Sequence, residues 1–78
     1  MEYTYITICC TYCHGEHSRI GYGIAYVCVA DGVVTVLQSV SDISSDRQRV
    51  ERLVEHCCKL GLDPMHLEDV VEDFMVSE

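Results

Sequence analysis

The hydrophobic pattern of this chain changes its period around Ser41–Asp46. Before this segment, apolar residues alternate with a period near two, as they do in β-strands. After it, they recur at the three- and four-residue intervals of amphipathic helices. The change divides the chain into a sheet-forming first half and a helical second half, and it therefore predicts an α+β fold.

Three strands are expected in the first half. They are Tyr3–Tyr12, Ile20–Ala30 and Val33–Val40, with the polar turn Cys13–Arg19 and the dipeptide Asp31–Gly32 between them. Asp-Gly favours a two-residue type I′ turn, in which both central residues need a positive φ. The expected sheet is an antiparallel meander, and the even-numbered residues of its first strand form the more apolar face: Ile6, Ile8, Cys10 and Tyr12.

The register of the second hairpin poses a difficulty. A two-residue turn predicts the pair Tyr26–Leu37 on one face, and the pairs Val27–Val36 and Val29–Val34 on the other. Both faces are then apolar, whereas two helices can cover only one of them. Either a bulge shifts the register, or the second face is buried against another subunit.

Capping signals delimit two helices in the second half. Ser45 and Gln48 form a capping box at the start of the first helix, and Gly61 is expected to end it as a left-handed cap on which Leu62 packs back. Asp63 then serves as the next N-cap, and Pro64 occupies the first turn. The expected core stripes are Val50, Leu53, Val54, Cys57 and Leu60 in the first helix, and Leu67, Val70, Val71 and Phe74 in the second.

These elements predict a single domain over residues 1–78. A three-stranded meander (3–40) is followed by a two-helix hairpin (45–76) packed on one face, in the order β-β-β-α-α. A chain of 78 residues is small, and domains of this size often need extra stabilisation from a disulfide, a metal or a partner subunit.

Charge limits the classes of partner. Thirteen acidic and 5 basic residues give a net charge of −8, which disfavours nucleic acid and anionic membrane surfaces. The sequence shows no signal-peptide pattern and no apolar run near the roughly 20 residues needed to span a bilayer. We therefore expect a cytoplasmic protein with reduced thiols, whose partner is basic or apolar.

The first turn holds the densest set of candidate metal ligands: Cys9, Cys10, Cys13, His14 and His17. Cys9 and Cys13 would lie roughly 13 Å apart along a strand, and Cys10 would point to the opposite face. Zinc takes four ligands, and only Cys13, His14 and His17 could converge here. Thiols that fill strand positions and a polar turn are the favoured interpretation, so we expect no metal and no cofactor.

Two further clusters have structural explanations. Arg47, Arg49 and Arg52 are expected to join Asp42 and Asp46 in ion pairs that lock the sheet–helix junction to the acidic second helix. The outward residues Glu68, Asp69, Glu72 and Asp73 are expected to form a solvated face, which could alternatively receive a basic partner, or a divalent cation with the help of His66. Adjacent His56 and Cys57 diverge by about 100° on a helix, so they do not form a catalytic pair.

The two segments that follow the sheet carry a family resemblance. Residues 41–47 read Ser-Asp-Ile-Ser-Ser-Asp-Arg, and residues 62–74 read Leu-Asp-Pro-Met-His-Leu-Glu-Asp-Val-Val-Glu-Asp-Phe. This pattern resembles a small uncharacterised domain-of-unknown-function family of clostridia-like Firmicutes, most strongly over residues 41–74. The resemblance implies a bacterial cytoplasmic origin and no assigned activity.

The sequence predicts a small interaction or regulatory module rather than an enzyme, because no nucleophile elbow, Gly-rich loop or paired catalytic carboxylate motif occurs. We expect a homo-oligomer, whose sheet contact involves Val27, Val29, Val34 and Val36. The alternative is a metal-binding or thiol-redox module that uses Cys13, His14 and His17.

Overall fold

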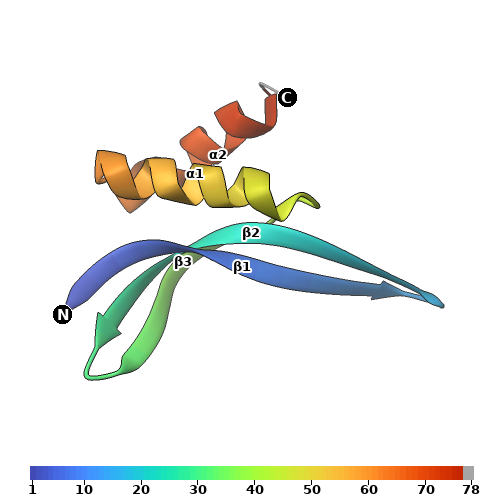
Figure 1. The fold of residues 1–78 in the computed structure, drawn as a ribbon, viewed down its shortest axis with the longest axis horizontal. Coiled ribbons are helices and arrows are strands. Elements are labelled where there is room, and N and C mark those ends of the chain that lie inside the picture. Colours follow the sequence, from blue (N-terminus) through green and yellow to red (C-terminus); the bar gives the residue numbers. More distant parts are fainter. Residues whose placement is uncertain (77–78) are drawn as a thin grey trace.

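Three antiparallel strands form one sheet in the order β1-β2-β3, and both helices lie on the same face of it (Figure 1). The computed structural model describes residues 1–76, apart from the side chain of His14. Its elements are β1 (Glu2–His14), β2 (His17–Ala30), β3 (Val33–Ser44), α1 (Arg47–Leu60), the 3₁₀ turn η1 (Pro64–His66) and α2 (Leu67–Val76). The predicted α+β fold and the order β-β-β-α-α are confirmed.

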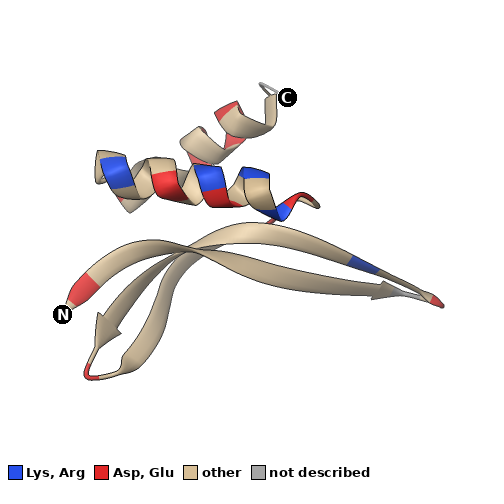
Figure 2. Ribbon diagram, in the orientation of Figure 1, with Lys and Arg blue, Asp and Glu red and all other residues tan. Residues whose placement is uncertain are grey.

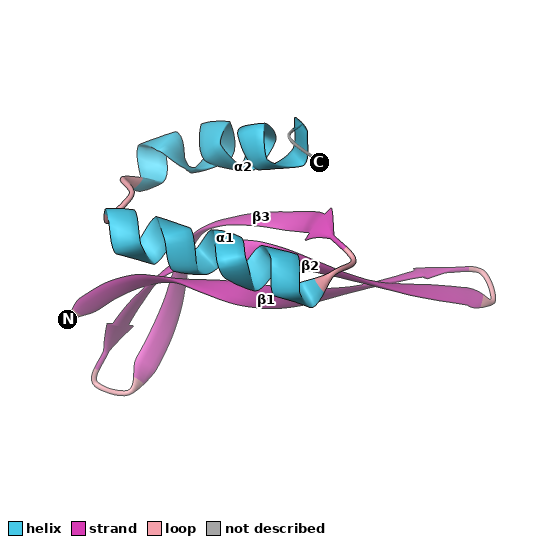
Figure 3. Cartoon of the chain, turned by 45° about the horizontal axis from the view of Figure 1, so that its top comes forward, coloured by secondary structure: helices cyan, strands magenta, loops and turns pink. Residues whose placement is uncertain are grey.

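The first hairpin is longer than predicted. Residues expected to form a loop between Cys13 and Arg19 instead extend β1 and β2, and the turn contains only Gly15 and Glu16. Gly15 adopts a φ of 64°, which allows so tight a connection. Polar residues are tolerated in these strand ends because they project beyond the helices into solvent (Figure 3).

A bulge resolves part of the register difficulty. The predicted pairs Val27–Val36 and Val29–Val34 are present, but Tyr26 pairs with Gln38 and not with Leu37. Leu37 is thus the extra residue of a bulge, and every later residue of β3 changes face relative to the predicted register. In this register Val40 lies opposite Ile24, on the face that the helices cover.

A second irregularity lets β3 cross close to β2. Between the pairs Tyr22–Ser44 and Ile24–Val40, one residue of β2 opposes three of β3. A side chain at Gly23 would coincide with the carbonyl oxygen of Val40, so only glycine fits there. Asp42 adopts a φ of 55° at this point, and Ile43 is brought into the core.

The sheet is arched, with its hairpin ends bent away from the helices (Figure 1). Ala25 and Val27 alternate with the helix-facing residues Ile24 and Tyr26, and they therefore lie on the other, concave side. Both are fully buried within the single chain. The curvature of the sheet therefore covers part of the second apolar face, in addition to the two alternatives, a bulge or another subunit, that the sequence left open.

The core lies between the convex side of the sheet and the helices. Its buried members are Tyr5, Ile24, Ile43, Val50, Leu53, Cys57, Leu67 and Val71. The odd-numbered face of β1, which carries Tyr5, therefore meets the helices. The predicted stripes are confirmed except at Leu60, which is 63% exposed because α1 has reached the edge of the packed region by its last residue.

Three of the predicted helix signals are confirmed and one is corrected. Gly61 is a left-handed cap, with φ 59° and ψ 41°, and Asp63 caps the following turn by accepting a hydrogen bond from the Met65 amide at 2.9 Å. Pro64 opens that turn, which is 3₁₀ rather than α-helical. The N-cap of α1 is Asp46 and not Ser45: its carboxylate accepts from the Gln48 amide at 3.0 Å.

Candidate functional site

Exposed apolar side chains gather at the start of β3. Val33, Val34, Val36 and Leu37 are between 52% and 62% exposed, and we call these four residues the edge patch. They lie in the hairpin end that bends away from the helices (Figure 1), where Thr35 is the one intervening residue. The segment from Val33 to Leu37 contains no charge and no proline.

The edge patch also lies on an open strand edge. β3 pairs only with β2, so the outward backbone N–H and C=O groups of residues 33–37 face no other strand. Proteins commonly protect such an edge with lysine, proline or an inward charge, because it is a template for pairing with another chain. The edge patch contains no lysine or other charged residue and no proline, and its one protective device is the bulge at Leu37. It therefore combines apolar surface with outward hydrogen-bonding groups.

The predicted interaction surface overlaps this patch in part. Val34 and Val36 are exposed as members of the edge patch, and Val29 is half-buried. Val27 has no exposed surface, so it can support such an interface only from behind. Sequence reasoning missed Leu37, because the unbulged register placed it against Tyr26; the uncharged run Val-Val-Thr-Val-Leu was the available signal.

The residues of the first turn do not assemble into a metal site in the part of the chain that the structure describes. Cys13 is paired with Ser18, whereas His17 is paired with His14, so Cys13 and His17 point to opposite faces. The side chain of His14 lies outside the described residues. Among the described side chains, no three His, Cys, Asp or Glu residues, His66 and its acidic neighbours included, lie close enough to hold a metal ion.

The adjacent cysteines Cys57 and Cys58 of α1 have structural roles. Cys57 is fully buried, and burial raises the pKa of its thiol, which disfavours the reactive thiolate. The Sγ atom of Cys58 donates to the carbonyl oxygen of Tyr5 at 3.6 Å and lies 3.6 Å from Thr4 Oγ1. Cys58 thus joins α1 to β1.

Tyr5 connects the sheet to the loop between the helices. Its hydroxyl donates to the carbonyl oxygen of Leu62 at 2.7 Å, and its side chain is only 5% exposed. Burial, followed by the nearby Cys57 thiol, raises the pKa of Tyr5 from 10.0 to about 12. The neutral phenol is therefore the form that fits the folded chain.

This raised pKa predicts a loss of stability in alkali. The unfolded chain ionises Tyr5 near pH 10, but the folded chain does so only near pH 12. Its contribution to the free energy of unfolding is thus complete below pH 10 and is lost as the pH rises through 12. Tyr5→Phe should flatten this part of the stability curve, measured by urea unfolding between pH 9 and 12, and should cost about 1 kcal/mol at neutral pH. A variant curve parallel to that of the wild type would contradict this assignment.

The two helices differ in charge: α1 carries residues of both signs, whereas the charged residues of α2 are all acidic (Figure 2). α1 carries both signs, including the ion pairs Arg47–Glu51 at 2.9 Å and Lys59–Glu55 at 3.0 Å. The sequence predicted that Arg47 and Asp42 would lock the junction to α2, but Arg47 pairs within α1 and Asp42 pairs with Arg19 of β2 at 2.9 Å. Arg49 does reach α2, since its guanidinium lies 5.9 Å from the centroid of the Phe74 ring.

Comparison with known proteins gives a family but no activity. Residues 1–77 match the model of a family of unknown function, DUF6514. No curated protein and no solved structure matches the chain. Within the described residues, no helix has the length and apolar character required to cross a membrane.

Proposed function

The chain belongs to the DUF6514 family, whose function is unknown, and we propose that it is a small non-catalytic interaction module that self-associates through the sheet. The observation that carries the proposal is the edge patch: four exposed, uncharged apolar residues on an open strand edge. Two copies of β3 paired antiparallel would join their sheets into one of six strands. Such pairing satisfies the backbone groups and covers the apolar side chains in the same step.

The symmetry of this arrangement suits a homodimer. An antiparallel pair of identical strands has a two-fold axis, so each copy contributes the same patch and the assembly closes. The patch carries no charge, and the overall charge of −8 therefore does not place like charges opposite each other at the contact. The contact would also extend the limited buried surface of a chain this small.

Two features support the cytoplasm as the compartment and a bacterium as the source, which are parts of the same proposal. All six cysteines are free, which suits the reducing cytoplasm. The resemblance of residues 41–74 to a clostridia-like family supports a bacterial origin. The partner of the assembled module is proposed to be a basic or apolar protein.

The mass of the protein in solution tests self-association. Light scattering coupled to size-exclusion chromatography should give twice the 8.8 kDa chain mass at micromolar concentration. Val36→Lys should give the monomer mass, because a charge would be brought onto the facing strand. Val36 is 57% exposed, so the monomer itself should fold unchanged.

Leu60→Lys is the control, since it introduces the same charge at an apolar side chain that is 63% exposed at the end of α1. The control should keep the mass of the wild type. A monomeric wild-type protein at micromolar concentration, or equal masses for the two variants, would contradict pairing through the edge patch.

A further inference from the structure

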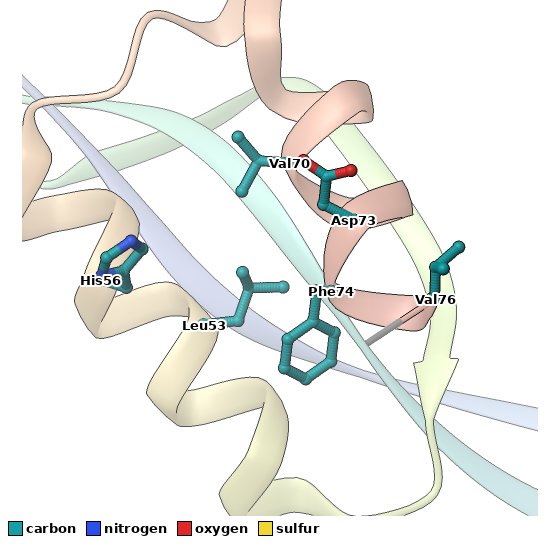
Figure 4. A pocket seen from close by; sticks show the side chains of 6 residues that line it. All are labelled: Leu53, His56, Val70, Asp73, Phe74 and Val76. Carbon is teal, nitrogen blue, oxygen red and sulfur yellow. The ribbon is translucent and has the colours of Figure 1, made fainter. Parts of the chain in front are cut away.

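A groove of about 590 Å³ separates α1 from α2 (Figures 3 and 4). Leu53 and His56 of α1 line one wall, and four residues of α2 line the other: Val70, Asp73, Phe74 and Val76. Figure 4 shows Leu53, Val70 and Phe74 in the space between the two helices. All the residues that line the groove belong to the two helices, and the edge patch takes no part in it.

The groove exists because α1 and α2 diverge from the loop that joins them (Figure 3). Leu53 and Val71 belong to the buried core, whereas Val70 and Phe74 pack against that core while remaining partly open. Val70 and Phe74 therefore keep part of their apolar surface exposed between the helices. The guanidinium of Arg49 approaches the Phe74 ring from α1.

The wall formed by α2 is acidic. Residues 60–76 contain no lysine or arginine, and none of the ion pairs in the described part of the chain involves a carboxylate of α2. Asp73 lines the groove, and Asp69 lies one turn before it on the same side of α2. The α2 helix of a second copy would bring like charges to this wall, which disfavours self-association here.

We propose that this groove binds an amphipathic helix of a partner protein that presents a basic edge to α2. Apolar residues of that helix at positions i, i+3 or i+4, and i+7 would rest on the partly exposed Val70 and Phe74, as in other helix-in-groove complexes. Lysine or arginine residues beside this stripe would pair with Asp69 and Asp73. The 10 residues of α2 give a wall about 15 Å long, which accommodates about three turns of the partner.

A pair of designed peptides tests both parts of the proposal. Each is a fluorescein-labelled helix of about four turns with leucine at the stripe positions. One carries lysine, and the other glutamate, along the edge that would face α2, with glutamine on the other edge. Fluorescence anisotropy should show saturable binding of the lysine peptide that weakens with salt, and at least about tenfold weaker binding of the glutamate peptide.

Two double variants locate the contact. Asp69→Lys with Asp73→Lys should weaken binding of the lysine peptide about tenfold or more. Glu68→Lys with Glu72→Lys is the matched control: it changes the net charge by the same amount at the same i, i+4 spacing, but about 100° around the helix. All four side chains are exposed, and circular dichroism should confirm that both variants fold.

The outcomes separate the proposal from its rivals. Equal weakening by both double variants would assign binding to the overall charge and overturn the groove. Equal affinity for the two peptides would mean that only apolar contacts drive binding, and would overturn the proposed role of Asp69 and Asp73. Absence of saturable binding would also overturn the proposal. The Val36→Lys variant should bind the lysine peptide as the wild type does, so the result is independent of self-association.

Discussion

Gly23→Ala should destabilise the fold by about 3 kcal/mol or more, the upper range for forcing an added methyl group into a packed site. The new Cβ would meet the carbonyl of Val40 and would lie 2.9 Å from the Cα atom of Ser41. Both neighbours are backbone atoms, so they cannot turn aside as the end of a side chain can. The close crossing of β2 and β3 would have to open, and Ile43 would leave the core.

Gly21→Ala is the control for this prediction. Its Cβ would meet the carboxylate oxygen of Asp42 at 2.5 Å, and that side chain can swing away. The cost should be limited largely to the exposed ion pair between Asp42 and Arg19, worth about 0.2–1 kcal/mol. Urea unfolding measures both variants, and equal losses would mean that β3 does not cross at Gly23 as described.

Leu67→Ala should cost about 3 kcal/mol, within the range of about 2–5 kcal/mol for such truncations in a core. Leu67 is the first residue of α2, has no exposed surface and belongs to the cluster that includes Val50 and Ile24. Its removal would leave a cavity at the point where α2 is anchored. For a domain of this size, the melting temperature should fall by about 4–8 °C per kcal/mol.

Leu60→Ala makes the same chemical change at a side chain that is 63% exposed. The loss at this position should stay within about 0.5 kcal/mol, as for most surface substitutions. Thermal unfolding followed by circular dichroism compares the two variants under one set of conditions. Similar losses would contradict the placement of Leu67 in the core and of Leu60 outside it.

Local signals predicted the turn of the second hairpin and the helix ends around Gly61 and Asp63 well. Asp31 and Gly32 form the expected turn with φ values of 53° and 76°, and the pairs nearest to it follow from its geometry. Gly61 and Asp63 cap their helices as predicted, since these interactions involve only neighbouring residues. At the start of α1, two adjacent residues were able to cap. Asp46 rather than Ser45 is the N-cap, and the end of β3 helps to hold it there, because the hydroxyl of Ser44 accepts from the amide of Asp46 at 3.1 Å.

Features that depend on distant residues were not predictable in the same way. The bulge at Leu37 brings Val40 onto the helix-covered face opposite Ile24, and nothing within residues 33–40 specifies that gain. Alternation alone identified Val34 and Val36 as candidate interface residues, but it misplaced Leu37 and did not foresee that curvature buries Val27. The groove depends on the angle between α1 and α2, for which the short connection gave only a range of arrangements.

The second hairpin projects beyond the helices, so its outer residues lie apart from the residues that form the core. None of residues 29–37 belongs to the buried core or packs against it. Substitutions at residues 33–37 are therefore expected to leave the packing between the sheet and the helices intact. If these residues make the proposed contact, that contact can change in sequence while the core stays the same.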